Sequence, residues 1–290
     1  MAYKYVVYEK QGNVATVTLN KPETLNRFVF VGRGEDAQEL DKALDEGADD
    51  DDVKVIIIKG AGRSFCAGGD LTQVGFIYGM GSGEPGERRP SQRVRLKLDR
   101  KGYDAFLRQL LNPKLTIAQV HGHCLGGGLY MALYCDYIIA AEDAKLGCVE
   151  QRLGFAGSGT PVMPLLIARI GLTKTLDLIL TGRTISGKEA ADMGLINKAV
   201  PADKLEEEVN KVAGAFSLLP RDGIAIGKAH RHMMYERLGL LSGFSQGYLT
   251  HTMFTNCRWE ADEYSFFKER RDKGAKAAFH GRDERYVKLE

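Results

Sequence analysis

The chain has 290 residues, of which 44% are hydrophobic and 27% are charged, and its formal net charge is +2. This length allows one substantial core, or one core with a terminal appendage. The small net charge gives no drive toward nucleic acid or a membrane surface. The N-terminus lacks an apolar signal core, and no run of about 18 apolar residues occurs. We therefore expect a cytoplasmic protein that binds neither nucleic acid nor membrane.

The first 200 residues alternate strand and helix signals. Residues 5–19 predict two strands around a turn at Gly12, with Ala15, Val17 and Leu19 on one face of the second strand. A helix is expected over residues 34–47. Short runs rich in β-branched residues predict buried strands over 53–58, 115–120 and 136–141. This alternation is typical of an α/β fold.

The strand signals stop after Pro201. Residues 203–219 are expected to be helical, and Pro220 separates them from further helix that reaches about residue 271. Ser186 and Glu189 form a capping box, which predicts another helix start. We therefore expect an α/β core over residues 1–200 and a helical C-terminal region over residues 201–290.

Two patterns resemble ligand sites but are interpreted as structural. Residues 81–86 match the dinucleotide pattern GxGxxG, yet no convincing strand precedes them, so a flexible loop is the better interpretation. His121, His123 and Cys124 suggest a metal site, but no second cluster at ligand spacing completes it. No metal is therefore expected.

Two glycine-rich segments offer more specific chemistry. The segment SFCAGGDL (residues 64–71) follows the strand at 53–58, and HGHCLGGG (residues 121–128) lies between a strand and a helix. Small residues leave backbone N–H groups accessible, and in the second segment these belong to a helix start, which favours negative charge. Two such donors that converge would form an oxyanion hole.

The order of these segments resembles the crotonase superfamily, the enoyl-CoA hydratase/isomerase family. The similarity covers roughly residues 5–235. It rests on five segments in the same order: TLNKPETLN, SFCAGGDL, HGHCLGGG, LGCVEQRLG and LTGRTISGKEAADMGLINKAV. The resemblance implies a spiral of repeated strand–strand–helix units and a C-terminal helical region that makes trimer contacts and completes the active site. A homotrimer or a dimer of trimers is expected.

The resemblance also implies a thioester of coenzyme A as the substrate, so that no separate cofactor is expected. Gly69 and Gly127 would supply the oxyanion N–H groups, and Glu150 would be the catalytic base. Contacts with the coenzyme A thioester are carried over to Thr24, Leu25, Ala67, Gly68, Asp70, Leu71, Gly126 and Gly157.

Tyr130 departs from the hydratase pattern. Hydratases of the family carry a glutamate two residues after the glycine triplet and a second glutamate twenty residues later, and this chain has Tyr130 and Glu150 there. A phenol with a pKa near ~10 is a poor base at neutral pH, although it donates hydrogen bonds. Tyr130 is therefore either a polar group of the site or an aromatic lining of the acyl pocket.

One remaining carboxylate favours double-bond isomerisation over hydration, because a single base can remove a proton at one carbon and return it at another. Three alternatives stay open: carbon–carbon cleavage or hydrolysis of a ketoacyl-CoA, decarboxylation, and a non-catalytic CoA-binding or assembly role.

The segment between the two glycine motifs, residues 71–120, is long for the family and rich in arginine and lysine. It is either a solvated helix after a mobile loop or a lid whose arginines contact CoA phosphates or an acidic acyl group.

Overall fold

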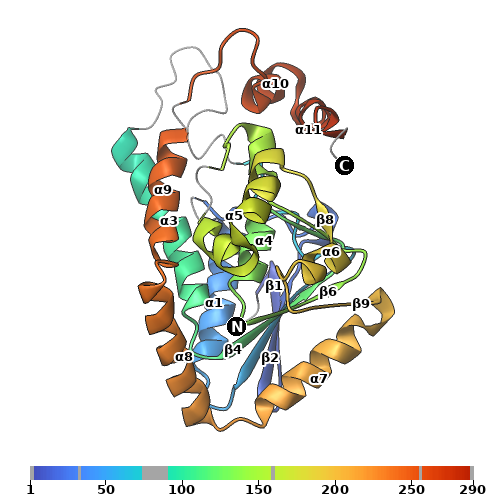
Figure 1. The fold of residues 1–290 in the computed structure, drawn as a ribbon, viewed down its shortest axis with the longest axis vertical. Coiled ribbons are helices and arrows are strands. Elements are labelled where there is room, and N and C mark those ends of the chain that lie inside the picture. Colours follow the sequence, from blue (N-terminus) through green and yellow to red (C-terminus); the bar gives the residue numbers. More distant parts are fainter. Residues whose placement is uncertain (1–2, 32–33, 74–90, 158–160, 255–256, 288–290) are drawn as a thin grey trace.

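The computed structural model describes residues 3–31, 34–73, 91–157, 161–254 and 257–287. Its centre is a six-stranded sheet in the order β1-β2-β3-β4-β6-β9, accompanied by a small sheet in the order β5-β7-β8 (Figure 1). The strands are β1 (Val6–Gln11), β2 (Val14–Leu19), β3 (Val55–Gly60), β4 (Leu115–Val120), β5 (His123–Leu125), β6 (Tyr137–Ala141), β7 (Lys145–Gly147), β8 (Ile185–Ser186) and β9 (Lys198–Val200).

Hydrophobic patterning explains the large sheet. β1 and β2 form the expected antiparallel hairpin, and Ala15, Val17 and Leu19 are fully buried. β2, β3, β4, β6 and β9 are parallel, and nearly every residue of β3 and β4 is buried. Parallel strands covered on both faces need such continuous apolar runs, which is why these strands were predictable from sequence.

The chain repeats one path through the two sheets. After β3, the backbone of Cys66 forms an isolated parallel β-bridge with that of Cys124, which belongs to β5 of the small sheet. After β4 the chain forms β5 and then helix α4, and after β6 it forms β7. A long strand of the large sheet is thus followed by a short strand of the small sheet, and the strand–strand–helix repeat expected from the resemblance is present.

The helices are α1 (Glu35–Asp49), α3 (Gln92–Leu110), α4 (Gly127–Leu133), α5 (Met163–Thr181), α6 (Gly187–Asp192), α7 (Leu205–Ser217), α8 (Arg221–Arg237), α9 (Ser242–Phe254), α10 (Phe266–Lys273) and α11 (Ala275–Glu284), and the 3-10 turns are η1 (Pro22–Thr24), η2 (Val149–Leu153) and η3 (Ala202–Lys204). The predicted helix start is confirmed, because Ser186 Oγ accepts the N–H of Glu189 at 3.0 Å at the start of α6, while the Glu189 carboxylate pairs with Arg183. Helices α5 and α11 and the short strands β5, β7, β8 and β9 were not anticipated.

The C-terminal helices serve different parts of the molecule. α7 packs on β3, β4 and β6, so it covers the large sheet. α9 lies along α3, and α10 packs with α11 at one end of the molecule (Figure 1). α7 lies after residue 200 but packs on the large sheet of the first 200 residues. The division of the chain into two domains at residue 200 stays a prediction.

Candidate active site

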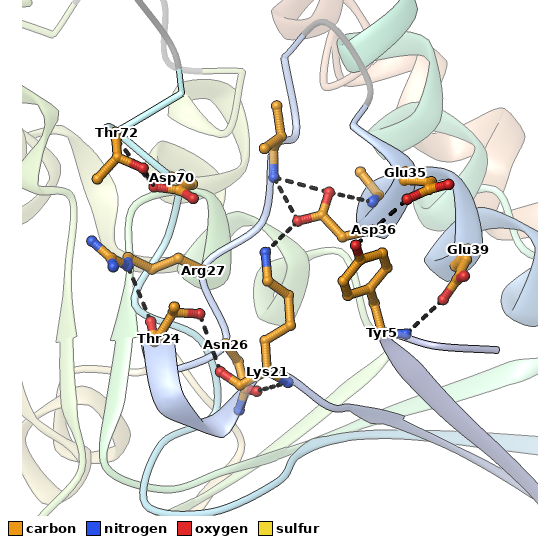
Figure 2. Close-up of polar contacts among 12 residues, drawn as sticks. Tyr5, Lys21, Thr24, Asn26, Arg27, Glu35, Asp36, Glu39, Asp70 and Thr72 are labelled. Carbon is orange, nitrogen blue, oxygen red and sulfur yellow. Dashed lines mark hydrogen bonds and ion pairs between the residues drawn. The ribbon is translucent and has the colours of Figure 1, made fainter.

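The loop after β2 is held in an unusual conformation by one buried side chain. Leu25 and Asn26 have φ of 56° and 54°, a left-handed conformation that costs a non-glycine residue roughly 1–2 kcal/mol. The Asn26 amide offsets this cost, since it donates to the carbonyl oxygens of Ala61 and Ser64 at 2.9 and 2.8 Å and accepts from Lys21 N–H at 2.8 Å. The same loop is tied to α1 by the ion pair of Lys21 with Asp36, 2.6 Å long (Figure 2).

This loop positions the first glycine motif. The carbonyl of Leu25 accepts the N–H of Ala67, and the backbone of Phe28 bonds both the carbonyl of Gly68 and the N–H of Asp70. Gly68 has φ of +98°, and a Cβ atom there would lie 2.7 Å from the carbonyl oxygen of Leu125. The N–H of Gly69 lies between the two bonded groups and has no acceptor in the described part of the chain.

The second glycine motif leads from β5 into α4. Gly126 has φ of +52°, and its carbonyl accepts the N–H of Tyr130, so it caps the helix. Gly68 and Gly127 are neighbours, because a Cβ on Gly68 would lie 3.6 Å from the nitrogen of Gly127. Within the described residues the N–H of Gly127 also has no protein acceptor. Both N–H groups proposed from sequence are therefore available to a ligand.

Glu150 lies against this second motif. It is the second residue of η2, and its Oε1 is 2.7 Å from where a Cβ of Gly126 would be. Its side chain is part of a cavity lining, while Oε2 is buried with no hydrogen-bond partner among the described residues. Burial raises the pKa of Glu150 above its usual value, and the nearby phenol of Tyr130 and charge of His251 oppose that shift only in part.

These groups meet in a cavity of about 650 Å³. Most of the site residues inferred from sequence line it: Glu150, Gly69, Gly127, Tyr130, Thr24, Leu25, Ala67, Gly68, Leu71 and Gly126. Asp70 and Gly157 are not part of its described lining. Asp70 Oδ1 instead accepts from the N–H and hydroxyl of Thr72 (Figure 2), and Gly157 lies at a second hollow beside α5 and α9.

The comparisons with known proteins fit this arrangement. A family model described as enoyl-CoA hydratase/isomerase matches residues 9–274. The chain belongs to this family. It is 32% identical over 259 residues to a protein of Mycobacterium bovis named probable enoyl-CoA hydratase echA8, with 86% of this chain and 87% of that protein covered. It is 34% identical over 211 residues to a probable enoyl-CoA hydratase of Rhizobium meliloti, with 72% and 73% covered.

Solved structures of the enoyl-CoA hydratase/isomerase family share the fold. An enoyl-CoA hydratase/isomerase from Xanthobacter autotrophicus Py2 has a TM-score of 0.82 and 29% identity, with 98% of this chain and 99% of that chain covered. An enoyl-CoA hydratase from Mycobacterium smegmatis has a TM-score of 0.82 and 26% identity, with 98% and 94% covered. The crotonase fold and the membership of an acyl-CoA enzyme family are thus confirmed.

Tyr130 occupies the position at which this family member departs from the hydratase pattern. It is 5% exposed, lines the cavity and packs edge-on against Phe106, with ring centroids 6.4 Å apart. Burial raises the pKa of its phenol well above 10, and the charge of Glu150 adds to the rise. Its hydroxyl is buried without a hydrogen-bond partner among the described residues. The side chain thus lines the cavity with its ring and lies near the carboxylate of Glu150, and its role in the site stays a prediction.

The helices α3, α9, α10 and α11 form a wall of the cavity that sequence reasoning missed. α3 contributes Tyr103 and Phe106, and the C-terminal helices contribute His251, Phe254, Phe267, Phe279, Arg282 and Asp283. No local motif marks these residues. The one available signal was general: the resemblance implied that the C-terminal region completes the site.

The arginine-rich segment is described only in part, since Arg88 and Arg89 lie outside the described residues, as do residues 81–86. α3 exposes Arg93, Lys97, Arg100, Lys101 and Arg108, and none of these five lines the cavity. Arg108 pairs with Asp41 and Asp45 of α1. In the described part, the exposed cations therefore form a solvated helix face, whereas Arg95 and Asp99 are buried on the opposite face.

From the sequence, His121, His123 and Cys124 suggested a metal site, but no metal was expected there. His121 Nε2 bonds the carbonyl of Gly62, His123 Nδ1 bonds the hydroxyl of Ser64, and Cys124 is fully buried. In the described part of the chain, no group of three or more potential ligands is placed to hold a metal ion. No described helix is long and apolar enough to cross a membrane.

Proposed function

We propose that this protein moves a carbon–carbon double bond in enoyl-CoA thioesters, with Glu150 as the base and the N–H groups of Gly69 and Gly127 as the oxyanion hole. The observation that carries the proposal is the position of Glu150, whose carboxylate touches the glycine turn that presents the N–H of Gly127. A thioester oxygen bound between the two N–H groups would place its α-carbon within reach of a carboxylate beside that turn.

The chemistry follows from these positions. Glu150 removes a proton from C2, and the electron pair spreads onto the thioester oxygen, where the two N–H groups stabilise the enolate. Return of the proton at C4 completes the shift. The raised pKa of Glu150 suits it to both steps, because a base is most effective when its pKa lies near the working pH.

Hydration is the second candidate, and the names of the relatives favour it. Addition of water requires one group to activate water and another to protonate the α-carbon. Glu23 and Asp283 are the other carboxylates of the described lining, but Glu23 is exposed and Asp283 pairs with Arg152 and Arg282. Tyr130 is a poor base because its pKa is raised further. We therefore place isomerisation ahead of hydration.

Cations on the cavity lining support coenzyme A as the carrier of the acyl group. Arg27, Arg63, Lys145 and Arg282 line the cavity together with the glycine motifs. Guanidinium and ammonium groups bind phosphate oxygens well. We propose that some of these side chains contact the phosphates of coenzyme A.

We also propose that the protein is a homotrimer or a dimer of trimers. Large apolar side chains are exposed on α5 and on the helices after residue 201, among them Leu172, Leu180, Leu218, Ile226, Met233, Leu249 and Met253. We infer that neighbouring subunits cover part of this apolar surface. Light scattering at micromolar concentration should give at least the trimer mass, and a monomer mass would contradict the proposal.

A panel of coenzyme A thioesters tests the proposed reaction. We expect turnover of a 3-enoyl-CoA, weak hydration of crotonyl-CoA, and no turnover of 3-ketoacyl-CoA esters. Glu150→Gln should lower kcat by about 10²–10⁴ because it removes the general base, with thioester binding retained. Glu142→Gln is the matched control, since Glu142 is exposed in the turn between β6 and β7. Turnover by Glu150→Gln near that of the unmodified protein would refute the mechanism.

A further inference from the structure

A histidine and an aspartate that no motif singled out form a pair at the helical wall of the cavity. His251 of α9 lines the cavity together with Glu150. Its Nδ1 lies 3.2 Å from Oδ2 of Asp99, a fully buried carboxylate on α3. The hydroxyl of Thr252 donates to the same oxygen at 2.6 Å. Asp99 is thus held in place by two groups of the neighbouring helix.

The surroundings of His251 fix its orientation. The ring stacks on Phe155, with centroids 5.4 Å apart, and lies 6.1 Å from the ring of Tyr103. With Nδ1 directed to an acceptor carboxylate, that nitrogen carries a hydrogen, and proton transfer then runs through Nε2 on the other side of the ring. An aspartate that sets the tautomer and orientation of a histidine is a common arrangement for acid–base catalysis.

Two observations argue against a purely structural pair. A buried carboxylate is costly, and an apolar pair would pack α3 on α9 at least as well. Furthermore, the histidine of the pair lies at the cavity rather than deep in the helix packing, because His251 is part of the lining. It is also close enough to Glu150 for the charge of His251 to oppose the burial that raises the Glu150 pKa.

We propose that His251 is a second catalytic proton-transfer residue of this pocket and that Asp99 is its positioning residue. The inference rests on the proposed isomerisation. Glu150 takes a proton from C2 of a 3-enoyl thioester, and the C2–H electron pair spreads onto the thioester oxygen as a dienolate held by the oxyanion hole. When this pair returns from the oxygen it forms the C2=C3 bond, and the C3=C4 pair forms the new bond from C4 to a proton. The His251 imidazolium gives its proton to C4, and the neutral imidazole regains a proton from solvent while Glu150 releases one.

This mechanism predicts where the proton at C4 comes from. With two groups, C4 receives a proton from solvent through His251. With Glu150 alone, some of the protons removed from C2 are carried to C4. The reaction of unlabelled 3-hexenoyl-CoA in D₂O separates the two routes, because the protium kept at C4 of the 2-hexenoyl product is measured by NMR or mass spectrometry.

We expect the unmodified protein to place solvent deuterium at C4 in nearly every turnover. His251→Phe keeps the ring stacking on Phe155 and removes proton transfer, so kcat should fall by about 10²-fold or more at similar KM, and protium carried from C2 should rise. His251→Gln should behave alike. Asp99→Asn should fall between these variants and the unmodified protein. His230→Gln, a histidine exposed on α8, is the matched control.

The outcomes distinguish the two proposals. Unchanged kcat and an unchanged label pattern in His251→Phe would overturn this inference and leave the proposed function intact. Absence of turnover by the unmodified protein would overturn both. If His251→Phe loses activity together with binding of butyryl-CoA or with thermal stability, His251→Gln decides, because its amide can still donate to Asp99. A folded, ligand-binding His251→Gln with unmodified kcat would contradict a catalytic role.

Discussion

The loop wall of the cavity presents the two backbone N–H groups of the proposed oxyanion hole, whereas the helical wall contributes through its side chains. The loop wall comprises residues 24–30, 67–69 and 126–127, and its conformation depends on Asn26 and on glycines with positive φ. The helical wall comprises α3, α9, α10 and α11 and is largely aromatic. The position of a backbone N–H group depends on the local backbone conformation, which a short sequence motif can specify. The positions of side chains from four helices depend on how those helices pack, and no short motif specifies that packing.

The largest effect is expected where the loop wall meets the base. In Gly126→Ala the added Cβ would lie 2.7 Å from Oε1 of Glu150, on a backbone with φ of +52°. We expect the carboxylate to shift and kcat to fall by about 10²-fold, the typical cost of misplacing a catalytic group by ~1 Å.

Gly214→Ala is the matched control for that variant, because a Cβ at Gly214 in the middle of α7 meets no atom within 4 Å. It should leave kcat unchanged and raise stability by roughly 0.5–1 kcal/mol. Steady-state kinetics and thermal melts check both variants. Full activity of Gly126→Ala would mean that the carboxylate is not held against this turn.

A smaller effect, on stability, is expected from alanine substitutions in the first glycine motif. Two neighbouring glycines there differ in backbone conformation. Gly68→Ala should destabilise the protein by about 1–3 kcal/mol, since its φ is +98° and its Cβ would meet the Leu125 carbonyl at 2.7 Å. Gly69→Ala meets no atom within 4 Å and should stay within about 0.5 kcal/mol of the unmodified protein. Denaturant unfolding measures both, and equal destabilisation would show that the backbone strain is not specific to Gly68.

Tyr130→Phe, on α4 between the two walls of the comparison, makes the smallest change. The Tyr130 hydroxyl is buried beside Glu150, and the phenol favours the charged form of that carboxylate. Burial raises the pKa of Glu150 and the Tyr130 phenol lowers it, so the variant should have a still higher Glu150 pKa. Because the base acts when deprotonated, the acidic limb of the kcat profile should move to higher pH. An unmoved limb would show that the phenol does not act on Glu150.

More of the loop wall than of the helical wall could be predicted from the sequence. Buried apolar runs predicted β3 and β4, and the glycine motifs with LGCVEQRLG pointed to Gly69, Gly127 and Glu150, which do line one cavity. His251 could not be found in this way, because its partner Asp99 is 152 positions away and the two meet only when α9 packs along α3. Asp70 and Gly157 show the converse limit, since Asp70 lies within a matching motif and Gly157 shortly after one, yet both are outside the described lining.

The central role of Glu150 is tested most directly by proton exchange on a substrate that cannot react further. Butyryl-CoA in D₂O reports only whether the α-proton is removed and returned, and NMR follows the loss of its C2 protons. The unmodified protein should catalyse this exchange, and Glu150→Gln, with butyryl-CoA bound, should lower its rate by about 10²–10⁴. Exchange by Glu150→Gln at the rate of the unmodified protein would contradict Glu150 as the base.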